Sequence, residues 1–227
     1  MYKACIFDLD GTLCDSVESI AYSANQAMRD LGFKEAGLED YKLFVGDGVD
    51  MLIRRLLHFA GDMEESRFTE LKSRYMEYFK EGCMYRVKPY PGIPEALEKL
   101  KGQGLHLAVL SNKPHSNTRN VIEKVFGTTS FDCILGQSDR FPRKPDPSSA
   151  RYLAELFDAM PEECLYVGDT GTDMKTGKSA GMYTVGVLWG FRGRKELEEE
   201  GADQVIAHPL ELAGISQNRM RRNEAEV

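Results

Sequence analysis

A short apolar run leads into two closely spaced aspartates at the start of the chain. Ile6 and Phe7 are typical of a buried strand, Asp8 and Asp10 follow at once, and Gly11 then allows a sharp turn. Residues two apart along a strand point to the same side, so an ideal strand would aim both carboxylates at one place. Such like charges repel, and a cation would relieve the repulsion. In an open α/β sheet, ligands bind at this end of a strand.

The same stretch also suits a strand that runs into an Asx-type turn, because Asp and Gly are common turn residues. An EF-hand loop does not fit, since Gly11 and Thr12 follow the second aspartate and Leu13 falls outside the loop pattern. The choice between a turn and a binding site depends on whether later strands also end in groups that complete a site.

Composition narrows the class of protein. The 227 residues can bury a substantial core, and 42% hydrophobic with 29% charged residues is typical of a soluble globular protein. A net charge of −7 argues against a surface for nucleic acid or anionic membrane. The first apolar run is too short for a signal peptide, and no stretch approaches transmembrane length. We therefore expect a cytoplasmic protein that binds neither nucleic acid nor membrane.

The five cysteines are scattered, without a Cys-x-x-Cys pair. This pattern indicates neither a disulfide framework nor a zinc site, and we expect reduced thiols that are mostly buried.

Residues 15–85 follow a helical pattern without strand-like alternation. One apolar face runs from Val17 to Leu31 and ends at Gly32, and similar faces predict helices near 49–57 and 68–79. Met and aromatic side chains at such positions suit core packing better than a cofactor site. An all-helical domain is expected here.

From Pro89 onward, helix and strand patterns alternate at the interval typical of βα units and a parallel sheet. The predicted fold class is therefore α/β, a Rossmann-like parallel sheet core with an inserted all-helical cap domain. The expected helices lie at 93–101, 150–157 and 174–180, and 121–126 is expected to be the end of another helix. The expected strands lie at 105–110, 134–135, 165–167, 184–187 and 204–206.

The sheet is entered near residue 4, left after the first aspartates and resumed near residue 86. We expect a catalytic core made of residues 1–14 and 86–216, a helical cap at 15–85 and a solvated polar tail at 217–227. Two connections beside the first strand would let the cap close over the strand end like a lid.

Three further strand ends carry polar groups that suit one task. Ser111 and Asn112 offer a hydroxyl and amides that can hold phosphate oxygens, and Lys144 lies between prolines as a point charge for a phosphoryl oxygen. Asp169 and Asp173 follow another strand, although Asp173 alone would suit a helix N-terminus. Each group has an ordinary alternative as a strand end, a turn lysine or a helix cap. If the carboxylates converge, an oxygen-only cluster suits Mg²⁺.

One motif is rejected. Gly177-Lys178-Ser179 resembles the end of a P-loop, but the pattern requires a glycine at position 172, which is Thr172. The segment is also expected within a helix rather than after a strand.

At this point the chain resembles the haloacid dehalogenase (HAD) superfamily. An all-helical insert directly after the first motif is similar to the cap of its phosphoglycolate phosphatase-like branch, as are the strings Ser111–Pro114 and Gly186–Phe191. Ser111 stands where many of these enzymes carry Thr, which keeps the hydroxyl. The likeness covers nearly the whole chain except the tail, and it rests on four motifs in order: Asp8-Leu9-Asp10-Gly11-Thr12, Ser111-Asn112, Lys144-Pro145 and Gly168-Asp169 through Asp173.

The resemblance implies a role for each matching residue. Asp8 is the nucleophile that forms an aspartyl-phosphate, and Asp10 is the general acid and base. Ser111 and Lys144 hold the phosphoryl group. The implied Mg²⁺ ligands are Asp8, Asp10 through its backbone carbonyl, Asp169 and, through water or outer contacts, Asp173. The expected substrate-binding residues are Gly11, Thr12, Asn112 and Arg54, the last with a solvated helix arginine as the alternative.

The predicted function is a Mg²⁺-dependent phosphatase acting on a small phosphorylated metabolite, such as 2-phosphoglycolate, as a monomer or homodimer. The superfamily's dehalogenases lack a carboxylate at the position of Asp10, which argues against dehalogenation. A β-phosphoglucomutase-like phosphomutase and an inorganic pyrophosphatase remain alternatives with the same core chemistry, and a non-enzymatic binding protein is a further one. The choice of substrate depends on the cap, whose loop Gly46-Asp47-Gly48 is a suggestive match.

Overall fold

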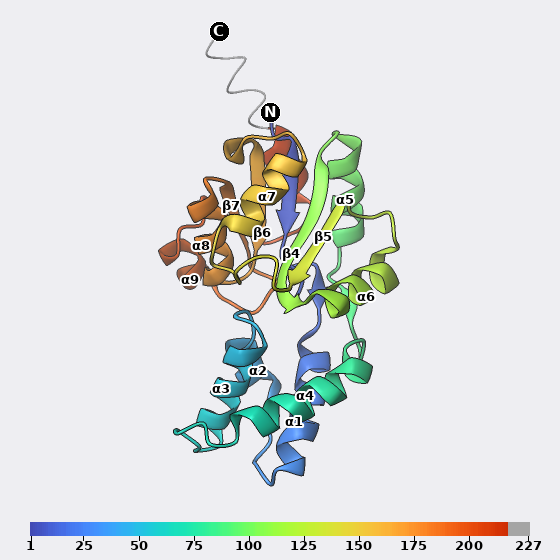
Figure 1. Cartoon of the computed structure of the whole chain (residues 1–227). Helices are drawn as coiled ribbons and strands as arrows, with labels where there is room; N and C mark the ends of the chain where they lie inside the picture. Colours follow the sequence, from blue (N-terminus) through green and yellow to red (C-terminus); the bar gives the residue numbers. More distant parts are fainter. Residues whose placement is uncertain (218–227) are drawn as a thin grey trace.

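The central element of the fold is a six-stranded sheet with the order β5–β4–β1–β6–β7–β8, in which every neighbouring pair runs parallel. The computed structural model describes residues 1–217, and Figure 1 shows the sheet at one end of the molecule and a group of helices at the other. The α/β fold class predicted from the sequence is confirmed. The strands are β1 (Ala4–Phe7), β4 (His106–Pro114), β5 (Cys133–Gln137), β6 (Cys164–Gly168), β7 (Tyr183–Val187) and β8 (Gln204–Ile206).

Alternating side chains of β1 supply two separate apolar layers. Cys5 and Phe7 join the layer beneath α5 (Ile93–Gly102) and α6 (His115–Phe126), whereas Ala4 and Ile6 join the layer beneath α7 (Ser148–Leu156) and α8 (Gly171–Ala180). This follows from the two-residue period of a strand. Since both faces are covered, β1 is apolar along its whole length and is held rigidly at the middle of the sheet. A 3₁₀ turn (Pro161–Glu163), α9 (Arg194–Glu199) and a helical stretch at 211–217 complete the core.

Four helices form the cap, which lies over the carboxyl edge of the sheet (Figure 1). They lie in sequence between the two strands of an antiparallel ribbon, β2 (Cys14–Asp15) and β3 (Lys88–Pro89). Their apolar faces pack on one another in a core of their own, which includes Met28, Ile53 and Phe79. The helices are α1 (Val17–Asp30), α2 (Leu38–Phe44), α3 (Val49–Phe59) and α4 (Phe68–Gly82).

The differences from the sequence prediction include two short helices and one strand extension. Helix α2 buries only Tyr41, and α9 buries only Leu197, so neither has a repeating apolar face that a pattern could reveal. Strand β4 continues to Pro114, because after an irregularity beyond Leu110 the chain pairs again with β5. Ser111 therefore lies inside the extended strand rather than after it.

The remaining expectations concern the cysteines, membrane-spanning helices, the polar tail and the domain boundaries. All five cysteines are free, and each except the half-buried Cys133 is buried. No helix among residues 1–217 is long and apolar enough to span a membrane. The expected polar tail, apart from Gln217, lies outside the described residues, and the expected domain boundaries stay a prediction.

Candidate active site

The strand β1 delivers Asp8 to the middle of the sheet's carboxyl edge. The backbone N–H of Asp8 donates to the carbonyl of Val167 at 2.9 Å, which continues the pairing with β6 by one residue. Because β4 and β6 flank β1, the residues that end these strands lie on either side of Asp8. This is the position where ligands bind in open parallel sheets.

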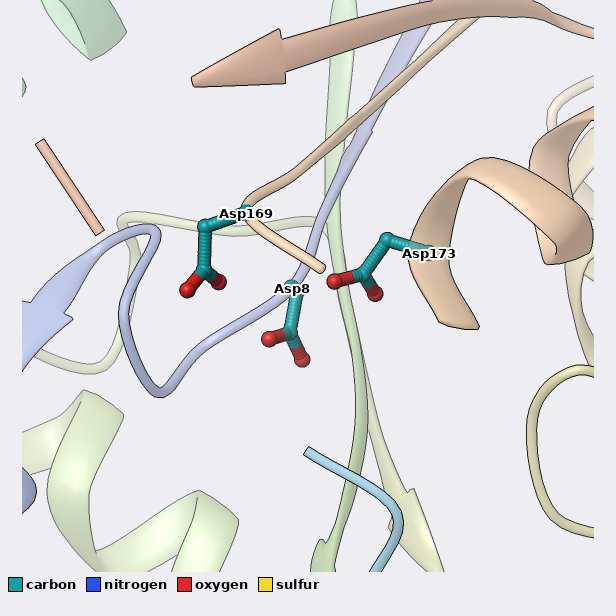
Figure 2. Close-up of side chains that lie close together, drawn as sticks. All are labelled: Asp8, Asp169 and Asp173. Atoms are coloured by element: carbon teal, nitrogen blue, oxygen red, sulfur yellow. The ribbon is translucent and has the colours of Figure 1, made fainter. Parts of the chain in front are cut away.

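Three buried carboxylates converge there. Asp8, Asp169 and Asp173 each offer an oxygen within 4.8 Å of the others. Figure 2 shows that they come from the ends of β1 and β6 and from the start of α8. Gly11, with φ of +92°, makes the close approach possible, because a Cβ atom there would lie 2.2 Å from a carboxylate oxygen of Asp169.

Lys144 joins two of these carboxylates. Its Nζ donates to Oδ1 of Asp8 at 2.8 Å and to Oδ1 of Asp173 at 2.7 Å, and its side chain is 3% exposed. A buried ammonium held in this way is fixed in position and keeps its charge. The lysine thus approaches Asp8 from the loop after β5, as a phosphoryl-binding cation would need to.

The other carboxylate oxygens are held by neighbouring donors. The hydroxyl of Thr12 donates to one oxygen of Asp169 at 2.9 Å, and the backbone N–H of Phe191 donates to the other at 2.8 Å. The N–H and hydroxyl of Thr170 donate to Oδ2 of Asp173. Asp173 therefore forms a capping box with Thr170, the N-cap residue of α8, and contacts Lys144 with its other oxygen.

Burial sets the electrostatics of the cluster. Loss of solvation raises the pKa of Asp8 to about 7, with Lys144 opposing the shift and Asp173 adding to it. Burial, reinforced by Asp173 and Asp8, also raises the pKa of Asp169 well above its usual range. For Lys144, burial opposes the charged form, but the two carboxylates outweigh it, so its pKa is raised. These carboxyls are expensive to ionise without a further cation.

The donor set fits a divalent metal ion of the hard class. Three carboxylates face one ammonium, which leaves two negative charges uncompensated when all are ionised. Oxygen ligands on buried, rigid elements suit Mg²⁺, which takes few protein ligands and completes its octahedron with water or phosphate. Asp8 and Asp169 would hold such an ion directly.

Asp10 has two partners that the sequence did not reveal. The hydroxyl of Ser16 donates to its Oδ1 at 2.6 Å, and Nζ of Lys113 lies 2.8 Å from Oδ1 and 3.2 Å from Oδ2. Lys113 lies two positions after Ser111 in the irregular part of β4, where the regular pairing with β5 is interrupted. No local strand pattern could therefore have placed the lysine beside Asp10.

The side-chain amide of Asn112 connects β4 with the Lys144 loop and with the cap. Its Oδ1 accepts from the backbone N–H of Lys144 at 3.0 Å, and its Nδ2 donates to the carbonyls of Lys144 and Gly46, both at 3.2 Å. Gly46 belongs to the cap, so this side chain joins the cap to the active-site loops. Ser111 is also buried, and it lines a cavity together with Asp8.

A cavity of about 40 Å³ is lined by residues of both the core and the cap. Asp8 and Asp10 line it from the core, and the cap supplies aliphatic, aromatic and glycine residues. Gly11 and Thr12 do not line this cavity, because they pack against Asp169 instead. The full lining is Asp8, Asp10, Ile20, Val45, Gly46, Gly48, Val49, Leu52, Tyr75, Phe79, Ser111, Asn112, Lys113 and Pro114.

The structure does not bring Arg54 to this cavity. Its guanidinium pairs with Glu65 within the cap and lies 4.9 Å from the ring centre of Phe68. The alternative interpretation, a helix arginine in local contacts, describes its position.

Polar contacts hold the cap against the core beside the cavity. The guanidinium of Arg192, which follows β7, donates to the carbonyls of Lys42, Leu43 and Val45, where α2 ends. The hydroxyl of Thr172 on α8 donates to Asp47, which also pairs with Arg55. The segment Val45–Gly48 is thus tied to several core loops.

A parallel sheet with an acidic site at its carboxyl edge and a helical cap above that site defines a capped α/β enzyme. Residues 5–187 match the family described as haloacid dehalogenase-like hydrolase. A phosphoglycolate phosphatase of Aquifex aeolicus is 31% identical over 218 residues, which are 96% of this chain and 98% of that protein. One of Mannheimia succiniciproducens is 32% identical over 94% of this chain and 98% of its own.

The solved structures agree. The crystal structure of a predicted phosphoglycolate phosphatase from Haemophilus somnus superposes with a TM-score of 0.88 at 29% identity, covering 95% of this chain and 98% of that one. The chain belongs to the haloacid dehalogenase-like hydrolase family, in its phosphoglycolate phosphatase-like branch. Its enzyme class is phosphoric monoester hydrolase.

Proposed function

We propose that the chain hydrolyses a small phosphomonoester, with 2-phosphoglycolate as the leading candidate, through an aspartyl-phosphate on Asp8. The observation that carries the proposal is the placement of one buried carboxylate, Asp8, against a buried ammonium and two further carboxylates at the edge of the sheet. The relatives named for phosphoglycolate support the choice of substrate.

In the first half-reaction, an oxygen of Asp8 attacks phosphorus and the bond from phosphorus to the ester oxygen breaks. Lys144 and Ser111 hold the phosphoryl oxygens, and Asp10 donates a proton to the leaving alkoxide. Phosphate monoesters react slowly mainly because charge and position are unfavourable, and a fixed ammonium beside the nucleophile addresses both.

In the second half-reaction, water attacks the phosphorus of the aspartyl-phosphate. Asp10, now ionised, takes the proton from that water, and the bond from phosphorus to Asp8 breaks to release phosphate. The cycle ends with Asp8 ionised and Asp10 protonated, so no further reactant is required. The cap limits entry of bulk water while the intermediate exists.

The proposed cofactor is Mg²⁺, held by Asp8, the backbone carbonyl of Asp10 and Asp169, with Asp173 beyond them. When bound, it would neutralise charge on the phosphoryl oxygens and on the buried carboxylates. Asp8 can then stay ionised as a nucleophile despite a pKa near 7 in the metal-free site.

The test compares wild type with Asp8→Asn, using the exposed Asp139→Asn as a matched control. Phosphate release is measured from 2-phosphoglycolate and p-nitrophenyl phosphate, with Mg²⁺ and with EDTA. We expect metal-dependent release by wild type and the control, and none by Asp8→Asn. Acid-quenched wild type should carry phosphate on the peptide that contains Asp8. Turnover by Asp8→Asn at the wild-type rate would refute this nucleophile.

The same assay separates the alternatives. Conversion of glucose 1-phosphate into glucose 6-phosphate without free phosphate would instead indicate a phosphomutase. Faster turnover of pyrophosphate than of any monoester would indicate a pyrophosphatase.

A further inference from the structure

Lys113 is a buried cation at the wall of the cavity. Its side chain is 3% exposed, its Nζ contacts both oxygens of Asp10, and it lies 4.8 Å from the ring centre of Phe79 on α4. The lysine thus lies between the core carboxylates and the cap. An ammonium removed from water in this way is costly unless it is paired or serves a ligand.

The cap offers no charged side chain to this cavity. The lining residues from the cap are glycine, aliphatic or aromatic, and Lys113 is the only cation that lines the cavity among residues 1–217. The nearby cap arginines have other partners, since Arg54 pairs with Glu65 and Arg55 with Asp47. A second anionic group on a substrate would therefore find one cationic partner.

The position of Lys113 along β4 matches that role. Ser111, which lines the cavity beside Asp8, precedes it by two residues, and the N–H of Lys113 donates to the Ser111 hydroxyl at 3.2 Å. This contact shows that the two residues lie next to each other at the wall of the cavity. A phosphoryl group at Ser111 would therefore place the far end of a short substrate near Lys113.

Asp10 does not require all of the hydrogen bonds that the Lys113 ammonium can donate. Ser16 already donates to Asp10 Oδ1 at 2.6 Å, so Asp10 keeps a partner when Lys113 turns toward a ligand. An ammonium has three N–H donors, and one can stay on Asp10 while another binds a substrate oxygen.

We propose that Lys113 binds a carboxylate on the substrate and thereby selects short phosphomonoesters that carry a second negative charge. This proposal deepens the proposed function and rests on it. The apolar cap side chains that line the cavity would cover the uncharged part of such a substrate. Selection then comes from a core residue, while the cap covers the apolar part of the substrate.

The experiment compares 2-phosphoglycolate with ethyl phosphate, in which a methyl group replaces the carboxylate, and with the uncharged amide 2-phosphoglycolamide. For wild type, Lys113→Gln, Lys113→Arg and the exposed control Lys124→Gln, kcat and KM are measured for each substrate. Circular dichroism and thermal unfolding verify that each variant is folded.

We expect wild type to prefer 2-phosphoglycolate over both uncharged esters. Loss of a charge-assisted hydrogen bond should lower this preference by about 10- to 100-fold in Lys113→Gln. The loss should fall on 2-phosphoglycolate, with a smaller change for ethyl phosphate. Lys113→Arg should recover part of the preference, and Lys124→Gln should match wild type.

Equal losses on all three substrates would overturn the proposal, because Lys113 would then act only on Asp10. Wild type that hydrolyses ethyl phosphate as well as 2-phosphoglycolate would also overturn it, without any variant, and would leave the proposed phosphatase intact. Wild type that releases phosphate from no ester would overturn both proposals.

Discussion

The core and the cap contribute to the site in different ways. The core supplies charged side chains that touch one another, such as Lys144 between Asp8 and Asp173, which come from a loop, a strand end and the start of α8. The cap supplies uncharged walls and the backbone of the segment Val45–Gly48. In the proposed function, the core would carry the chemistry, whereas the cap would provide shape and closure. Substitutions in the two regions should therefore fail in different ways.

The largest effect is expected in the core. Replacing Lys144 with Met removes the ammonium that neutralises Asp8 and Asp173, and we expect kcat to fall by about 10²- to 10³-fold, as for loss of one preorganised donor. The exposed lysine variant Lys175→Met serves as the control. Steady-state phosphate release measures both. A Lys144→Met enzyme with unchanged kcat would break the assignment of chemistry to the core.

A smaller effect is expected where the two regions meet. Arg192→Ala removes three hydrogen bonds to the carbonyls that end α2, so the cap should close less completely. We expect kcat/KM to fall by at least about tenfold, because the loss of even one charge-assisted hydrogen bond has a cost of that size. Both kcat and KM should change, as for a loosened lid.

The matched control for Arg192→Ala is Arg194→Ala, which breaks only an exposed pair with Glu198. If both variants had the same kinetics as wild type, the contacts of Arg192 would not control closure.

The core and the cap also differ in how well the sequence predicts their site residues. Asp8, Asp169 and Lys144 follow apolar strands, and parallel strands bring their carboxyl ends to one edge, so local pattern predicts their meeting. Lys113 was missed as a site residue because the strand continues past Leu110, and pairing with the neighbouring β5 produces that extension.

The cap was less predictable for a physical reason. Its four helices follow from apolar periodicity, except α2, which buries a single tyrosine. Which helix residues face the cavity depends on how the helices pack on each other and on the core. Arg54 and Arg55 are neighbours in sequence, yet one pairs with Glu65 and the other with Asp47. No local pattern distinguishes them.

Metal-free protein offers a test of the buried charge in the core. The pKa of Asp8 is raised to about 7, so the folded state binds more protons than the unfolded state between about pH 4 and 7. Protonation of Asp8 therefore contributes fully to the free energy of unfolding below this window, and this contribution is lost as pH rises through it. In EDTA, the Tm should fall by roughly 3 °C per pH unit between pH 5 and 7.

Asp8→Asn should reduce this slope, and Mg²⁺ should abolish it in wild type. Differential scanning calorimetry at low salt measures all three. A Tm of the metal-free protein that rises between pH 5 and 7 would show that burial does not raise the pKa of these carboxyls. One reason for a metal ion at this edge of the sheet would then be removed.

The smallest effect is expected for Arg54, in the cap. Its pair with Glu65 is 44% exposed on the arginine side, and such pairs contribute less than about 1 kcal/mol. We therefore expect Arg54→Ala to change kcat/KM for 2-phosphoglycolate by less than about threefold and to lower the Tm by only a few degrees. Arg55→Ala, which releases Asp47 beside the cavity loop, should have the larger kinetic effect. A selective rise in KM for 2-phosphoglycolate in Arg54→Ala would mean that the cap also carries a substrate cation, and the contrast between a charged core and an uncharged cap would no longer hold.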